Sequence, residues 1–172
     1  MRLLSLLLLL SSMACAAITL PKSFQADFIQ TITNTKGKII KYAGKVSFSN
    51  ERDFKWSYTQ PTKKEVCTDG QELLVVDHDL QQVSSYYILK GIDIAKVLEH
   101  AKLHSKTIYV AQYEDKHYTI QLHQKKLHSI AYFDNLDNKV QIVFKHIKYG
   151  KNMLSKKMMQ CHYPKEYDMI RG

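Results

Sequence analysis

The stretch IKYAGKVSFSNERDFKWSYT, residues 40–59, decides the fold class of this chain. Large side chains or a glycine occupy every second position in most of it: Tyr42, Gly44, Val46, Phe48, Phe54, Trp56 and Tyr58. The residues between them are mostly small or charged. A period of two is typical of β-strands that have one apolar face and one face in water. The stretch therefore predicts two strands whose large side chains share one side of a sheet.

The same alternation continues along most of the chain. Further strands are predicted at residues 66–68, 72–77, 82–88, 107–113, 117–122, 127–133, 140–147 and 155–162. Turn-forming residues separate them, and Asp69-Gly70 predicts a hairpin in which both central residues have positive φ. Because strands joined by short loops are antiparallel neighbours, the chain is predicted to form an antiparallel meander.

One helix is predicted within this pattern, from Gly91 to His104. Its apolar residues recur at helical spacing and would form one face of the helix: Ile94, Val97, Leu98 and Ala101. A shorter helix is an alternative for residues 21–30, but the run from Ala26 to Thr33 favours a strand there.

The predicted helix is too small to cover the predicted sheet. A sheet of many twisted strands curls, and one helix about 10 Å across cannot cover such a surface. The sheet either closes into a packed barrel or remains a curved, unclosed half-barrel with the helix as its lid. We predict the second, a mainly β fold whose apolar concavity suits an apolar ligand. The predicted cavity-lining residues are Tyr42, Val46, Phe48, Phe54, Trp56, Tyr58, Leu73 and Val75, and the predicted lid residues are Ile94, Val97, Leu98 and Ala101.

Residues 1–16 have the features of a cleaved secretory signal. A basic residue precedes an apolar run from Leu3 to Leu10, and Ala14-Cys15-Ala16 is a small-residue cleavage site. The run is far shorter than the ~20 residues that a membrane-spanning helix needs. The mature chain is then one domain, residues 17–172, exported to the periplasm. An alternative is that the segment ending at Cys15 acts as a lipobox, in which case an acylated Cys15 anchors the protein.

The charge and the cysteines give weaker indications. The net charge is +9, but the lysines are scattered, so we interpret them as a solvated basic exterior and predict no nucleic-acid partner. Cys67 and Cys161 remain after cleavage, and an oxidising compartment permits a disulfide between them. The sequence does not determine whether their backbones come close enough to pair.

Catalytic motifs are missing from the sequence. It contains no Gly-x-Ser-x-Gly elbow, phosphate-binding loop or dinucleotide fingerprint. His100 and His104 have the spacing of a helical metal-binding pair, but no Glu follows His100 and no third ligand is evident. We therefore predict neither an enzyme nor a bound metal or cofactor.

Four short motifs follow one another between Ser23 and about Leu89. They are Ser23-Phe24-Gln25-Ala26-Asp27-Phe28-Ile29-Gln30, then Gly44 with Phe54-Lys55-Trp56-Ser57-Tyr58-Thr59-Gln60-Pro61, then Thr68-Asp69-Gly70 with Leu73, Val75 and Asp77, and then Leu80-Gln81-Gln82-Val83. In order and in spacing they resemble the periplasmic outer-membrane lipoprotein carrier family, LolA. Beyond Leu89 the match is limited to strand pattern and length.

This resemblance implies an unclosed barrel with a helical lid that transports lipoprotein acyl chains from the inner to the outer membrane. It also implies two partners, an inner-membrane ABC-type lipoprotein-releasing complex and an outer-membrane receptor or the outer membrane itself. We expect a monomer. The family's latch arginine lies four residues before the Phe of F-x-W; Asn50 occupies that place here, so Arg52 is the possible latch. Two alternatives remain open: a receptor of the same fold anchored through acylated Cys15, and a packed periplasmic β-domain that binds no lipid.

Overall fold

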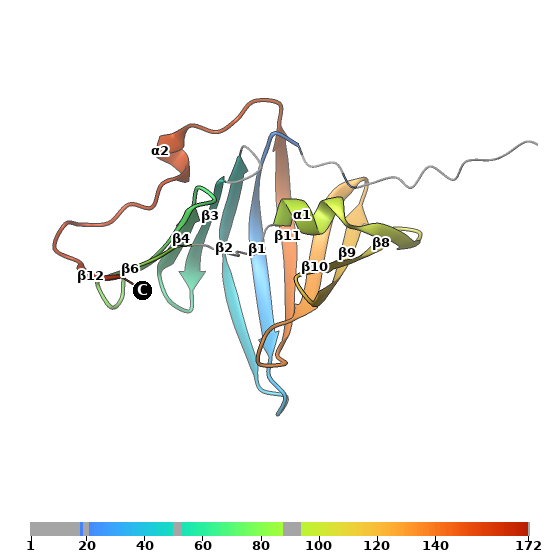
Figure 1. The fold of residues 1–172 in the computed structure, drawn as a ribbon, viewed down its shortest axis with the longest axis horizontal. Helices are drawn as coiled ribbons and strands as arrows, with labels where there is room; N and C mark the ends of the chain where they lie inside the picture. Colours follow the sequence, from blue (N-terminus) through green and yellow to red (C-terminus); the bar gives the residue numbers. More distant parts are fainter. Residues whose placement is uncertain (1–17, 19–20, 50–52, 88–93, 172) are drawn as a thin grey trace, which may run out of the picture.

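The computed structural model describes Ile18 and residues 21–49, 53–87 and 94–171 (Figure 1). Three features of the sequence analysis lie outside these residues. They are the predicted signal peptide, the possible acylation site Cys15 and the possible latch Arg52.

The described residues form one twelve-stranded sheet and two short helices. The strands are β1 (Ser23–Thr33), β2 (Ile39–Ser49), β3 (Asp53–Gln60), β4 (Lys64–Thr68), β5 (Glu72–Asp77), β6 (Gln82–Tyr87), β7 (Lys102–Ser105), β8 (Ile108–Tyr113), β9 (Lys116–His123), β10 (Lys126–Phe133), β11 (Lys139–Gly150) and β12 (Asp168–Arg171), and the helices are α1 (Ile94–Glu99) and α2 (Lys156–Met159). Across the sheet the order is β12-β6-β5-β4-β3-β2-β1-β11-β10-β9-β8-β7. Every pairing is antiparallel except that of β12 with β6, and the two end strands do not meet. The predicted fold class, a curved and unclosed antiparallel sheet with a helix, is confirmed.

One face of this sheet is concave. Cross-strand partners project from the same face, and the alternating large residues of β1, β2 and β3 form such rows, for example Phe24, Phe48 and Phe54. The rings of Trp56 on β3 and Phe144 on β11 lie 6.3 Å apart although β2 and β1 separate their strands. Only strong curvature brings those rings together, so the face that bears them is the concave one.

Helix α1 lies on the concave face, but it is shorter than predicted (Figure 1). It ends at Glu99, and Lys102–Ser105 form strand β7, which pairs with β8. The predicted continuation to His104 is therefore wrong. Pairing with β7 satisfies the backbone hydrogen-bonding groups of β8, which would otherwise form an open sheet edge. The stability gained from these hydrogen bonds outweighs the local preference of residues 102–105 for a helix.

The structure decides between the two alternatives for residues 21–30. They lie largely in β1, which pairs with β2 on one side and with β11 on the other. The shorter helix is therefore wrong, and the strand begins at Ser23, three residues before the predicted start at Ala26.

Two further local predictions are wrong. The strand predicted at residues 155–162 is helix α2 followed by irregular chain. This segment lies over strands that already pair with one another, so its backbone-to-backbone hydrogen bonds are local, such as Gln160 N to Lys156 O at 3.1 Å. In the Asp69-Gly70 turn only Gly70 has positive φ, because Asp69 Oδ1 accepts bonds from the N–H groups of Gln71 and Glu72 in a longer loop.

The convex face has a second, smaller core. Residues on the convex side of β4, β5 and β6 are buried together with a residue of α2: Cys67, Val76, Val83 and Met159. In the view of Figure 1, the chain after β11 runs over the top of the sheet to α2 and then down the left side of β4 to β6, where it adds β12 to the edge of β6. The sheet is thus covered by α1 on one side and by the C-terminal segment on the other. No helix in the described part of the chain is long and apolar enough to cross a membrane.

Candidate functional site: the concave face

Beneath α1 the concave face is densely packed. Val97, Leu98 and Ala101 are buried in one cluster with the concave side chains of the central strands. Phe48 and Val46, two of the predicted cavity-lining residues, belong to the same cluster and are fully buried. In this conformation the part of the concave face under the helix is therefore a packed core.

Over β3 to β6 the same face is apolar but only half-buried. Three cross-strand rows define it: Phe54, Thr68, Leu73 and Tyr86; then Trp56, Val66, Val75 and Ser84; then Tyr58, Lys64, Asp77 and Gln82. We call the apolar part of these rows the platform: Trp56, Val66, Leu73, Val75 and Tyr86. Tyr86 is 44% exposed, and the other four side chains are partly accessible. Lys64 and Asp77 form an ion pair of 3.0 Å that borders the platform.

Trp56 connects the platform to the packed core. Its ring lies edge-on to Phe28 with centroids 4.8 Å apart, and Phe28 is fully buried. Tyr58 contacts Phe28 in the same manner at 5.1 Å. Offset and edge-on aromatic pairs fix ring orientation, so one edge of the platform is held by the core.

Tyrosines line the end of the concave face that lies near the β1–β2 hairpin. The hydroxyl of Tyr58 donates to Gln30 Oε1 at 3.2 Å, and the Tyr42 ring lies 5.8 Å from that of Tyr58. Burial raises the pKa of Tyr58 to about 12, with smaller contributions from Tyr132 and Tyr42. Burial likewise raises the pKa of Tyr132 to about 12. Tyr58 on β3 and Tyr132 on β10 both pack against the buried cluster of the concave face.

These two phenols predict a loss of stability at alkaline pH. Below the unfolded-state value of about 10 both phenols are protonated in either state, so their stabilising effect is complete. Between about pH 10 and 12 the unfolded chain releases protons that the folded chain keeps, so the free energy of unfolding falls as pH rises. Urea titrations at several pH values measure this slope. Tyr58→Phe and Tyr132→Phe should flatten it, whereas Tyr87→Phe, at an exposed position, should not; an equal effect of all three variants contradicts the assignment.

The predicted site residues thus divide into two groups. Val46, Phe48 and Phe54 lie in the packed core with the lid residues Val97, Leu98 and Ala101. Tyr42, Trp56, Tyr58, Leu73 and Val75 are partly accessible on the same face. The side chain of the fourth lid residue, Ile94, lies outside the described side chains. His100 follows the end of α1 and His104 lies on β7, so they do not form a helical pair.

Sequence reasoning missed two platform residues, Val66 and Tyr86. Val66 lies opposite both Trp56 and Val75, and Tyr86 lies opposite Leu73. The alternation within each short strand was visible, but the register between strands was not. Pairing residues 66–68 with residues 72–77 across a two-residue turn at Asp69-Gly70 would have placed Val66 on the same face as Leu73 and Val75, although opposite Leu73 and not opposite Val75.

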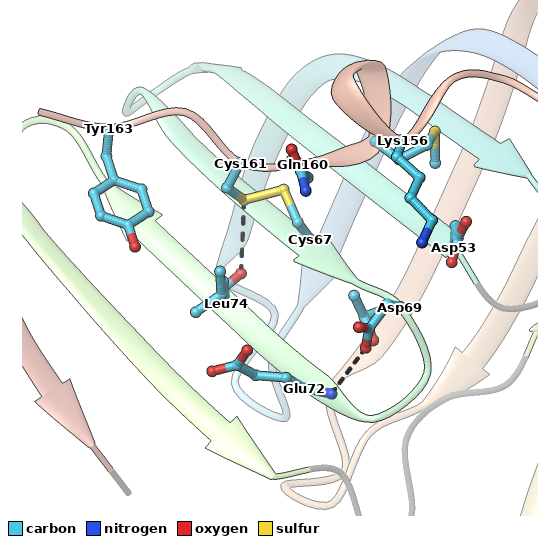
Figure 2. A pocket seen from close by; sticks show the side chains of 11 residues that line it. Asp53, Cys67, Asp69, Glu72, Leu74, Lys156, Gln160, Cys161 and Tyr163 are labelled. Carbon is cyan, nitrogen blue, oxygen red and sulfur yellow. Dashed lines mark hydrogen bonds between the residues drawn. A yellow bond between two sulfur atoms is a disulfide. The ribbon is translucent and has the colours of Figure 1, made fainter.

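A separate pocket of about 340 Å³ lies on the convex side, between the sheet and the C-terminal segment (Figure 2). Polar and charged side chains supply much of its lining, including Asp53, Asp69, Glu72 and Lys156. Hydrogen bonds from the N–H groups of Gln71 and Glu72 lower the pKa of Asp69. None of the predicted cavity-lining residues borders this pocket, so it is distinct from the predicted cavity.

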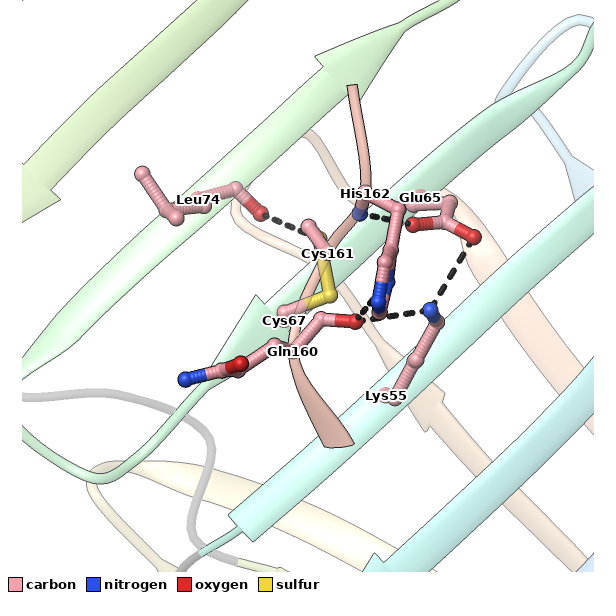
Figure 3. Close-up of a disulfide and its surroundings, with 7 residues drawn as sticks. All are labelled: Lys55, Glu65, Cys67, Leu74, Gln160, Cys161 and His162. Atoms are coloured by element: carbon pink, nitrogen blue, oxygen red, sulfur yellow. Dashed lines mark hydrogen bonds and ion pairs between the residues drawn. A yellow bond between two sulfur atoms is a disulfide. The ribbon is translucent and has the colours of Figure 1, made fainter. Parts of the chain in front are cut away.

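A disulfide joins the C-terminal segment to the sheet beside this pocket. Cys67 on β4 is bonded to Cys161, with their Cα atoms 5.7 Å apart (Figure 3). Lys55 Nζ contacts the Gln160 carbonyl oxygen at 2.8 Å and Glu65 at 3.1 Å, and Glu65 accepts from the N–H of His162. Ligand atoms of Glu65, Cys67 and Cys161 lie within 4.8 Å of one another, but sulfurs bonded to each other do not bind a metal.

Comparisons with known proteins agree in pointing to one family. The sequence model for "Outer membrane lipoprotein carrier protein LolA" matches residues 20–131. The chain is 30% identical over 172 residues to an outer-membrane lipoprotein carrier protein of Wolinella succinogenes, with 99% of each chain covered. It is 31% identical over 150 residues to that of Campylobacter jejuni, covering 87% of this chain and 86% of the other. An uncharacterized conserved protein from Thermus thermophilus shares the fold, with a TM-score of 0.56 at 12% identity over 89% of this chain and 92% of that one.

Proposed function

The chain belongs to the outer membrane lipoprotein carrier protein family, LolA, and we propose that it binds lipoprotein acyl chains on its concave face and transports them between membranes. Proteins of this family are carriers and not enzymes, which agrees with the prediction from the sequence. The platform is the proposed first contact for the acyl chains, and α1 is the proposed lid.

One observation supports the platform above all others. The part of the sheet that bears it, β4 to β6, already has a core on its convex side, where Val76 and Val83 are fully buried. Leu73 and Val75 project from the opposite face of the same strands and stay partly accessible. Folding of these strands does not require that face to be covered, so it is free to bind a ligand.

The chemistry of the platform suits an acyl chain. Removing apolar surface from water stabilises a complex by about 25 cal/mol per Å², without directional bonds that select one ligand. Aliphatic and aromatic walls therefore accept acyl chains of different lipoproteins. The Lys64–Asp77 pair at the border is the nearest charged group in the rows and marks where a polar head group would meet the protein.

Opening of the proposed lid would enlarge this binding surface. Val97, Leu98 and Ala101 cover the packed core that continues from Trp56. Displacement of α1 would expose Val46, Phe48 and Phe54 next to the platform, so acyl chains could replace the helix over one continuous apolar face. The lid then closes the core when the carrier is empty.

We also propose the location and the partners that the family implies. The chain acts in the periplasm after removal of residues 1–16, takes lipoproteins from an inner-membrane ABC-type releasing complex and gives them to an outer-membrane receptor or to the outer membrane itself. The partners are supported by family membership, and the location also by the signal-like start of the chain.

Titration of the mature chain with a synthetic diacylated lipopeptide tests the proposal. Trp56 is the single tryptophan and lies on the platform, so its fluorescence reports binding directly. We expect a saturable change, and about tenfold weaker binding for Val75→Glu because a buried carboxylate must be desolvated. The matched control is Val110→Glu, at an exposed position of β8, which should bind like the unchanged chain.

A second variant in the same titration examines the lid. Leu98→Ala removes buried contacts that hold α1 closed, so the open form becomes more populated and binding should tighten several-fold. Circular dichroism confirms that each variant is folded. A folded chain without saturable binding is the result expected of a packed β-domain and contradicts the proposal; unchanged affinity of Leu98→Ala contradicts only the lid.

A further inference from the structure

Two hairpin turns at one end of the sheet have the same internal structure. In the β1–β2 turn, Asn34 Oδ1 accepts from the N–H groups of Lys36 and Lys38, and Asn34 N–H donates to the Lys38 carbonyl. In the β10–β11 turn, Asp134 Oδ1 accepts from Leu136 and Asn138, and Asp134 N–H donates to the Asn138 carbonyl. Each turn therefore holds its middle residue, Lys36 or Leu136, at its apex.

The sheet places these turns side by side although a hundred residues separate them. Thr33 on β1 pairs with Ile39 on β2 and with Lys139 on β11, and Lys139 pairs with Phe133 on β10. The four strands therefore end in one row, and Figure 1 shows both hairpin tips at the bottom of the view.

This end of the molecule exposes large apolar side chains among lysines. Ile39 is 56% exposed, Phe133 60% and Leu136 76%, and the three neighbouring lysines are exposed as well. We call this region the tip surface: Lys36, Lys38, Ile39, Phe133, Leu136 and Lys139.

The turn geometry explains some of these residues but not the apolar ones. Asn34 and Asp134 act as caps of the turns, and Gly37 adopts a φ of +79°. Nothing in the turn requires leucine at position 136, where a polar side chain would be better solvated. The carboxylate of Asp134 is turned into its own loop, where it also accepts from the Asn138 side chain at 2.9 Å. Asp137 is the exposed carboxylate of the same turn, so Lys36, Lys38 and Lys139 outnumber it around the apolar side chains and leave the tip surface with a net positive charge.

We propose that the tip surface docks on the surface of an anionic lipid bilayer. Apolar side chains that project from two rigid turns can enter the head-group region, while the surrounding lysines are attracted to anionic lipids. Further lysines continue the basic character along the convex face of the central strands, among them Lys41, Lys45 and Lys145. This inference goes beyond acyl-chain binding, and it is measured on the protein without cargo.

Flotation of the mature chain with vesicles tests the tip surface. The vesicles contain equal parts of phosphatidylcholine and phosphatidylglycerol, and pure phosphatidylcholine serves for comparison. We expect binding to the anionic vesicles that weakens at high salt. Replacing Lys36, Lys38 and Lys139 together by glutamine should weaken it about a hundredfold, because each lysine near an anionic surface strengthens binding about fivefold.

The matched charge control replaces three exposed lysines elsewhere, Lys125, Lys157 and Lys165, by glutamine. It changes the net charge equally and should weaken binding less than about threefold by comparison. Phe133→Ser with Leu136→Ser should weaken binding at least about tenfold, whereas Leu80→Ser with Met153→Ser, at comparably exposed positions, should not. Equal losses in tip and control variants would mean that only overall charge matters and would overturn the proposal.

A tryptophan at the apex gives a direct readout. Leu136→Trp in a Trp56→Phe chain should shift its emission to the blue when anionic vesicles are added, and Leu80→Trp in the same chain should not. Sedimentation velocity measures the oligomeric state and so tests whether the tip surface binds a second copy of the chain instead. If the tip variants change the oligomeric state and leave vesicle binding unchanged, the tip is an interface between copies and the proposal is wrong.

Discussion

Replacing both Cys67 and Cys161 by serine is expected to lower the free energy of unfolding by about 4 kcal/mol. The bond closes a loop with a sequence separation of 94 residues, and a loop of that size restricts the unfolded chain strongly. The loss should arise because the unfolded chain gains conformational freedom when the bond is removed. The native contacts should remain, since the hydrogen bonds of Gln160 and His162 to β3 and β4 do not involve the sulfurs. Urea unfolding followed by circular dichroism measures it.

Two comparisons make this experiment specific. The unchanged chain with its disulfide reduced should unfold at the same urea concentration as the double variant. Acyl-chain binding should be nearly unchanged below the transition, because the disulfide lies on the convex side and the platform on the other face. A double variant as stable as the oxidised chain would show that the bridge contributes nothing.

Gly44→Ala is expected to destabilise the protein by about 3 kcal/mol. A Cβ at this position would overlap the carbonyl oxygen of Ser57 and lie 2.9 Å from the Cα of Tyr58. Both obstacles are backbone atoms of β3, and the pairing of β2 with β3 shifts register between Ala43 and Gly44. The strands must separate to admit the methyl group, which is an overpacking cost that side-chain rotation does not relieve. Thermal and urea unfolding measure the change.

Gly37→Ala is the matched control for this prediction. A Cβ at residue 37 would have nothing within 4 Å, but φ is +79°, so the cost is the conformational one of about 1 kcal/mol. If both substitutions cost the same, the close approach of β3 to Gly44 is not the reason for glycine there.

The alternation of side chains predicted most of the strands correctly because it is a local property. Strand β5 has the predicted bounds, and residues 42 to 48 lie on β2 with Val46 and Phe48 buried on the concave side. The predictions failed where tertiary pairing supplied the backbone bonds. Lys102–Ser105 pair with β8 at the edge of the sheet although their spacing is helical. Residues 160–162 are bonded to β3 and β4, strands that already pair with neighbours on both sides.

The candidate site depended on tertiary structure to a greater degree. Local pattern placed Trp56, Leu73 and Val75 on one face of their strands, but it gave no register and therefore missed Val66 and Tyr86. It also gave no reason why that face should stay accessible. The structure shows that these strands have their fully buried side chains, Val76 and Val83, on the convex face, the face on which Cys161 of the C-terminal segment is bonded to Cys67.

By itself the sequence determined a curved antiparallel sheet with one amphipathic helix, because side-chain periods of two and of 3.6 are properties of neighbouring residues. Only the tertiary structure decided the pairing of Cys67 with Cys161, the two cores on opposite faces and the meeting of the β1–β2 and β10–β11 turns. Each of these joins segments that are far apart along the chain, and it is the curvature and register of the sheet that bring them together.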